Sequence, residues 1–277
     1  MPQRSSRSGF TLIEALIALV ISGLVASALI SLLVGQSRFY ERTDDAIYAE
    51  QSLRATFDLM SAELRVAGAP DLVAAEGDSV TVRFDVARAV VCDSVDADEA
   101  ALFVYDTITN ANLPASFVGT AYSGPWESDY DYADGWTGSV SETGSGPRAV
   151  CTAAGAPGTG TDDLYLAITG WSGHFADGVP DRGSVVRRYR ALTYRFGASS
   201  FFTSRTALWR GSQELVGPFE DGAGFSYVMD DGSVETSVSG SDLEDVTAIR
   251  VTATAVGDGA NRFGVSRSME FDIPFRN

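Results

Sequence analysis

The chain has 277 residues, of which 45 % are apolar, and its formal net charge is −17. The apolar share is high enough for a folded core and excludes a chain that is disordered by composition. All twenty basic residues are arginines, and the acidic excess argues against strong binding to nucleic acids, because their phosphates would be repelled.

The first predicted element is a membrane-spanning helix over residues 10–34. A short polar segment, residues 1–9, precedes it and carries Arg4 and Arg7. The apolar run contains one charged residue, Glu14, and is long enough to cross a bilayer as a helix, whereas the apolar core of an ordinary secretory signal is shorter. The two arginines place the N-terminus in the cytoplasm and the rest of the chain outside it.

Residues 35–67 predict an amphipathic continuation of the same helix. Apolar residues recur at helical spacing, and charged residues lie mostly on other faces. The apolar positions are Phe39, Ala46, Leu53, Phe57, Met60 and Leu64. No proline interrupts this region before Pro70. We therefore expect one helix from Phe10 to about Val66, which ends at Gly68.

Residues 68–277 predict a β-rich globular head. Short alternating or β-branched runs are separated by turns rich in glycine and aspartate, which is typical of an antiparallel sheet. The predicted strands cover residues 79–86, 101–105, 163–169, 184–196, 207–209, 225–229, 246–255 and 268–273. Residues 111–161 are interpreted as a long surface loop or a small subdomain. The predicted fold class is α+β, with the long helix packed on the sheet.

Two cysteines, Cys92 and Cys151, fall in the part of the chain that the orientation places outside the cytoplasm. In an oxidising compartment two cysteines of one domain often pair, so we predict a disulfide between them. The alternative is a pair of buried, unreactive thiols.

Two clusters of acidic residues carry carboxylates of the kind that bind calcium. They comprise Asp129, Asp131 and Asp134, and Asp93, Asp96, Asp98 and Glu99. Calcium takes six to eight oxygen ligands, but neither run has the spacing of an EF-hand loop. We therefore expect no cofactor, with calcium as the alternative, and no structural zinc site, which needs four Cys or His ligands.

No catalytic constellation accompanies His174, the single histidine, so we predict a non-enzymatic protein in which this residue is structural. An aromatic group lies within residues 111–161 and forms either a contact surface or a loop folded on its own rings. It comprises Tyr122, Trp126, Tyr130, Tyr132 and Trp136.

The junction of the leader and the helix carries the most specific motif, Gly9-Phe10-Thr11-Leu12-Ile13-Glu14. Here the sequence resembles the type IV prepilin family, which includes minor pilins and the pseudopilins of type II secretion. The resemblance implies a pilin fold and makes residues 1–9 a prepilin leader. It also implies cleavage between Gly9 and Phe10 by a prepilin peptidase, and N-methylation of the new Phe10 amine.

Glu14 is predicted to act in assembly. A carboxylate among apolar residues costs about 2.5–3.5 kcal/mol on membrane-insertion scales, so such a residue persists where it finds a partner. The predicted partner is the Phe10 amine of a neighbouring subunit. The alternative is that Glu14 simply lies at the level of the lipid headgroups.

The order of elements toward the C-terminus is similar to that of W-type minor pilins and J-type minor pseudopilins. The similarity rests on Tyr194-Arg195-Phe196, Leu208-Trp209-Arg210, the turn Asp230-Asp231-Gly232 and residues 249–252. It implies a minor pilin with a structural or assembly role at the tip of a type IV pilus-like filament or in a priming complex. The alternatives are a minor pseudopilin of a type II secretion system, and a pilus-tip adhesin or DNA-uptake receptor.

The family resemblance also implies where the protein works. The expected partners are other pilin subunits, the prepilin peptidase and the bacterial inner membrane. Before assembly the chain would cross that membrane once, with its N-terminus in the cytoplasm and its head in the periplasm or outside the cell. After assembly it would belong to a filament at the cell surface.

Overall fold

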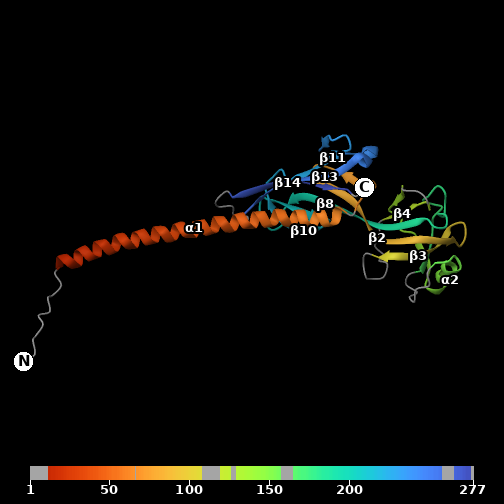
Figure 1. The fold of residues 1–277 in the computed structure, drawn as a ribbon, viewed down its shortest axis with the longest axis horizontal. Coiled ribbons are helices and arrows are strands. Elements are labelled where there is room, and N and C mark those ends of the chain that lie inside the picture. The colour runs from red at the N-terminus through yellow and green to blue at the C-terminus, as the bar shows by residue number, and fades with distance from the viewer. Residues whose placement is uncertain are drawn as a thin grey trace, which may run out of the picture.

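The computed structural model describes residues 12–65, 67–107, 119–125, 129–156, 165–257 and 265–275. A long helix carries a head built on one antiparallel sheet of 14 strands (Figure 1). This architecture confirms the predicted α+β class, in which a long apolar N-terminal helix is followed by an antiparallel head. It is consistent with the pilin fold.

Helix α1 spans Leu12–Leu64 without a break, and its 53 residues extend about 80 Å at 1.5 Å per residue. Its N-terminal part projects away from the head (Figure 1), and its first buried residue is Asp45. The predicted continuous helix is confirmed over these residues. Phe10 and Val66, its predicted ends, lie outside the described part of the chain.

The head packs on one face of the C-terminal half of α1. Met60 and Leu64 of the predicted apolar stripe are buried there, whereas Phe39 is 66 % exposed. The predicted apolar stripe therefore packs on the head only in its C-terminal part. The reason is the position of the head, which reaches the helix at Asp45. Gly257 comes so close there that a Cβ atom on it would stand 2.6 Å from Asp45 Cβ.

The part of the head beside the helix, here named the proximal lobe, contains β1 and the C-terminal strands. Their bounds are β1 Leu72–Ala75, β9 Thr206–Arg210, β10 Gln213–Phe219, β11 Gly224–Met229, β12 Val234–Glu235, β13 Val246–Val256 and β14 Ser266–Pro274, with the 3-10 turns η1 Ala69–Asp71 and η3 Gly240–Asp245. β13 pairs with β11 along one edge and with β14 along the other. Its buried residues Ile249 and Val251 share one hydrophobic core with Met60 and Leu64 of α1.

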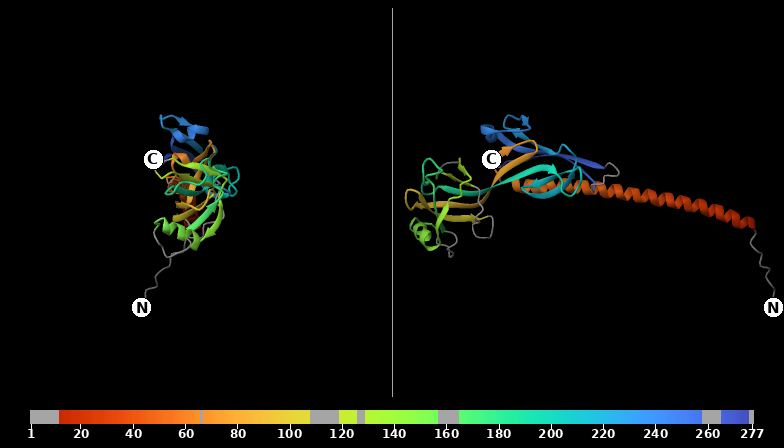
Figure 2. Two further views of the ribbon diagram at one scale, coloured as in Figure 1. Left: turned by 90° about the vertical axis from the view of Figure 1, so that its right-hand side faces the viewer. Right: turned by 180° about the vertical axis from the view of Figure 1, so that it is seen from behind.

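The distal lobe lies beyond the C-terminal end of α1 (Figure 2). Its elements are β3 Glu99–Thr107, β4 Gly119–Ser123, β5 Asp131–Asp134, β6 Ser139–Thr143, α2 Ser145–Ala153 and β7 Tyr165–Thr169. Its main core is separate from that of the proximal lobe and includes Trp136, Trp171 and Phe175. The described residues of the 111–161 region thus form β4, β5, β6 and the helix α2, which agrees with the alternative of a small subdomain and not with that of a long loop.

Two long strands join the lobes. β2, Ser79–Ser94, and β8, Val185–Ala198, pair along most of their length. β2 supplies Val82 to the proximal core and Val91 to the distal core. Between them, just after Asp85, the pairing register shifts, and such a bulge bends a strand and increases its twist. The chain therefore turns from one lobe into the other at this point.

Each of the eight predicted strand ranges overlaps a strand of the structure. The sequence did not predict β1, β4, β5, β6, β10, β12 or the helix α2.

Candidate functional site: the exposed helix and the junction between the lobes

The N-terminal half of α1 presents an apolar surface that the head does not cover. Leu12, Leu19 and Leu24 are 84 %, 75 % and 69 % exposed. Among the described residues α1 is the one helix long and apolar enough to span a membrane, and none of that apolar stretch is buried. A surface of this kind is unfavourable in water, so a bilayer or other chains must cover it.

Glu14 lies in the first described turn of this helix and is exposed. It is the single charged residue between Leu12 and Ser37. Gly9 and Phe10 lie outside the described residues, so the cleavage site, the methylated amine and the pairing of that amine with Glu14 stay predictions.

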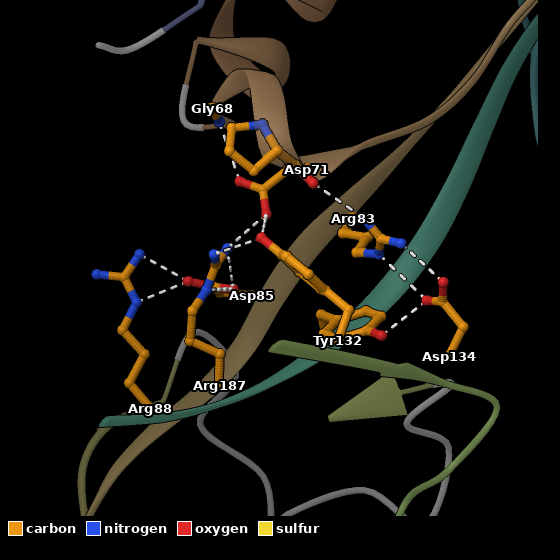
Figure 3. Close-up of polar contacts among 10 residues, drawn as sticks. Gly68, Asp71, Arg83, Asp85, Arg88, Tyr132, Asp134 and Arg187 are labelled. Carbon is orange, nitrogen blue, oxygen red and sulfur yellow. Dashed lines mark hydrogen bonds and ion pairs between the residues drawn. The ribbon is translucent and has the colours of Figure 1, made fainter. Parts of the chain in front are cut away.

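At the other end of α1, Asp71 ties the helix end to the distal lobe (Figure 3). One carboxylate oxygen accepts a hydrogen bond from the backbone N–H of Gly68, at 3.0 Å, just after the helix ends. The other accepts bonds from Arg187 Nη2 of β8, at 2.9 Å, and from the Tyr132 hydroxyl of β5, at 3.2 Å. One side chain therefore links the helix terminus to two strands beyond it.

Asp85, at the bulge in β2, completes the buried group. Its side chain is 2 % exposed and accepts hydrogen bonds from Arg187 Nε and from Arg88 Nε, each at 2.7 Å. The Arg187 side chain is itself only 10 % exposed and bridges Asp85 to Asp71. We call Asp71, Asp85 and Arg187 the junction triad. A buried arginine held by two carboxylates is compensated in charge, whereas loss of Arg187 would leave two buried carboxylates without their shared cation.

A second ion pair lies beside the triad. Arg83 of β2 donates hydrogen bonds to both carboxylate oxygens of Asp134, at 3.1 and 2.7 Å, and its guanidinium stands 4.1 Å from the centre of the Tyr132 ring. The Tyr189 hydroxyl donates to the same Asp134 at 2.7 Å. The hydrogen bonds from Arg83 lower the pKa of Asp134 below its usual value, and burial raises the pKa of Tyr189. Asp134 thus stays ionised and fixes β5 against β2 and β8.

Sequence reasoning did not select the junction triad. One signal for it was present, because Arg187, Arg188 and Arg190 fall inside a predicted strand. Consecutive residues of a strand point to opposite faces, so at least one of Arg187 and Arg188 had to face the interior of the head. A buried arginine requires carboxylate partners.

These features can be compared with known proteins. Residues 4–30 carry a prokaryotic N-terminal methylation motif. This type IV prepilin-like motif covers most of residues 1–9 and much of the apolar half of α1, and it does not extend into the head. It implies processing by a prepilin peptidase and assembly with other pilin subunits, and it fits anchoring of the chain in a membrane by α1. No curated protein and no solved structure matches the chain.

In the head of this prepilin-like chain, Cys92 of β2 and Cys151 of α2 form a disulfide, with 4.8 Å between their Cα atoms. Cys151 is fully buried and Cys92 is 5 % exposed. The bond ties α2 to the sheet of the distal lobe, in the part of the chain that the positive-inside rule places outside the cytoplasm.

We expect free-thiol labelling of denatured, unreduced protein to find no thiol, and to find two after reduction. The bond joins residues 59 positions apart. Replacing both cysteines by serine should therefore lower the free energy of unfolding by roughly 3–4.7 kcal/mol in the loop-entropy model. Protein that is labelled at two thiols before reduction would contradict the pairing.

The carboxylates of the acidic clusters take part in local structure. Asp134 pairs with Arg83, and Asp98 accepts hydrogen bonds from the hydroxyl and the backbone N–H of Ser172, at 2.7 and 2.8 Å. These bonds lower the pKa of Asp98. Within the described ranges no three or more His, Cys, Asp or Glu side chains are grouped so that they could hold a metal ion. The geometry therefore gives no support to the calcium alternative.

The aromatic residues of the distal lobe pack mostly on one another. Tyr122 and Trp136 are 7 % and 8 % exposed, and both rings contact Phe175 edge-on, with centroids 4.8 and 5.4 Å apart. His174 stacks on Trp136 at 5.1 Å. For Tyr122 and Trp136 the packing of aromatic rings on one another is therefore confirmed, although in strands and turns and not in a long loop, and these two rings do not form a contact surface. Trp126 lies outside the described residues.

Proposed function

We propose that this chain is a minor pilin, a structural subunit at the tip or in the priming complex of a type IV pilus-like filament. The observation that carries the proposal is the uncovered apolar half of α1 together with the methylation motif at its start. Residues 12–34 extend about 35 Å as a helix, which matches the hydrocarbon thickness of a bilayer. The helix can thus leave the membrane for a filament only if other apolar helices replace the lipid.

The head supports a role as a structural subunit. It is fixed to the helix by a shared core and by the junction triad, so helix and head would move as one unit during assembly.

The pilus assignment is tested by deleting the gene. We expect surface filaments to be lost while the set of exported proteins is unchanged; loss of exported proteins with normal filaments would identify a pseudopilin instead.

Glu14 is expected to act in assembly and not in folding. Replacing Glu14 by Ala removes the one charge from the apolar half, which should ease membrane insertion. It also removes the proposed partner of the Phe10 amine of the next subunit. We expect the variant to be made, processed and retained in the membrane, with recovery of partner subunits reduced about tenfold or more, which corresponds to about 1.4 kcal/mol.

Co-purification of partner subunits, normalised to the level of the protein in the membrane, is the measurement. Glu41→Ala provides a matched control, because Glu41 is an exposed acidic residue of the same helix outside the apolar half. Normal recovery with Glu14→Ala would show that Glu14 has no part in assembly. A degraded head would show that the anchor and the head are not independent.

A further inference from the structure

The turn between β8 and β9 displays an aromatic side chain. Phe201 is 77 % exposed, more than any other large apolar residue in the described part of the head. Glu214 holds the turn by accepting hydrogen bonds from the Ser199 hydroxyl, at 2.6 Å, and from the backbone N–H of Ser200, at 2.7 Å. Ser204, with φ of 56°, is the one non-glycine residue in the described ranges with a positive φ. Such strain persists where surrounding contacts enforce it, and it is frequent at functional sites.

Phe201 borders a groove of about 530 Å³ between this turn, β10 and the C-terminal half of α1. Most of its lining is apolar. The apolar lining residues are Tyr48, Ala55, Phe201, Phe202, Leu215 and Val216. Glu214 is the one charged residue that lines the groove, and it is already bound to Ser199 and Ser200. The groove therefore suits an apolar partner without charges.

While the apolar half of α1 lies in the bilayer, lipid cannot reach this groove. Tyr48, the groove residue nearest to the N-terminus, lies 14 residues beyond Val34, which is about 21 Å along the helix. Lipid chains that surround residues 12–34 end well before that level. An apolar occupant of this groove would therefore have to come from another polypeptide with an uncharged surface.

We propose that this groove binds the apolar helix half of a neighbouring pilin-like subunit. The inference rests on the proposed function, because a subunit of that class presents the required surface. In this chain the corresponding segment has no charged side chain from Ala15 to Ser37. Its middle, near Gly23, and the groove, near Gln51, are 28 residues apart, about 42 Å along the helix. Neighbouring subunits would thus be staggered by about 40 Å along the filament axis.

Site-specific photocrosslinking tests the contact in the full-length chain in its own membrane. Phe201 is replaced by p-benzoylphenylalanine, and Val95 of the distal lobe, which is 49 % exposed, serves as the matched control position. We expect position 201, and not position 95, to cross-link to a peptide from the apolar helix of another subunit. Cross-links from position 201 only to lipid, to its own chain or to the folded head of another protein would overturn the inference. A cross-linked species of twice the mass of the chain, with the peptide from this same sequence, would identify the neighbour as a second copy.

A Phe201→Ser variant supplies a second readout. Phe201 is largely exposed, so the midpoint of unfolding should change little. Recovery of partner subunits should fall about fivefold or more, as for an aromatic anchor of an interface, and Phe201→Leu should restore most of it. Unchanged recovery with Phe201→Ser would overturn the inference alone. If the wild-type chain recovers no pilin-like subunit at all, the proposed function fails together with the inference.

Discussion

A Gly9→Val protein is expected to stay uncleaved in the membrane, nine residues longer than the processed chain. Glycine offers no side chain at the scissile bond, so a peptidase can approach the backbone closely, and a β-branched side chain would block that approach. Processing of the unaltered chain removes Arg4 and Arg7 and changes the formal charge from −17 to −19. Mass spectrometry of the membrane protein measures both forms, and Ser6→Val in the same leader is the matched control. Normal processed protein from Gly9→Val would contradict cleavage after Gly9.

The composition gives this experiment an independent check. The chain contains no lysine, so after cleavage the Phe10 amine is the one site that a reagent for primary amines could label. If Phe10 is methylated, such reagents should leave the processed chain unlabelled. Labelling of the processed chain would show that its new N-terminus is not methylated.

An Arg187→Met protein is expected to lose about 3–5 kcal/mol of unfolding free energy, because Asp71 and Asp85 then remain as buried carboxylates without their shared cation. Arg54→Ala is the matched control. Arg54 forms an exposed ion pair with Glu50 on α1, and such pairs contribute about 0–1 kcal/mol.

Denaturant unfolding of the full chain in detergent, followed by tryptophan fluorescence, measures the difference. Trp136 and Trp171 report on the distal lobe and Trp209 on the proximal lobe. A double variant that also carries Asp71→Asn should be more stable than Arg187→Met alone, since Asp85 keeps Arg88 as its partner and no buried carboxylate is then left unpaired. Equal stability of Arg187→Met and Arg54→Ala would show that the junction triad does not stabilise the fold.

The elements that local patterns specify could be predicted from the sequence. The 3.6-residue period of α1 and the alternating runs of β2, β8 and β13 are encoded within single segments, and the structure contains all of them. The start of packing on α1 could not be predicted, because it depends on where Gly257, more than 200 residues further along the chain, meets Asp45. The helical period continues toward the N-terminus past the last contact with the head, and periodicity alone cannot show where contact ends.

The distal lobe illustrates a second limit. β4 and β5 are short, and they form because β4 pairs with β8 and β5 pairs with β4. A Cβ atom on Gly119 of β4 would stand 2.3 Å from the Tyr189 ring of β8, so this glycine permits the close approach of two distant segments. A segment rich in glycine and serine is predicted to be a loop when the strands that pair with it are unknown. The junction triad likewise joins residues up to 116 positions apart.

The arrangement of β2 and β8 makes the distal lobe an insertion within a hairpin. Phe84 of β2 is paired directly with Arg190 of β8, and the described residues of the distal core fall between these two positions in the chain. A single in-frame deletion that joins the two strands by a tight turn would therefore remove the whole lobe, with both cysteines. The order of the strands around α1 would be unchanged. A head of this type can gain or lose an entire lobe in one genetic event, while the helix and the surface that packs on it keep their sequence.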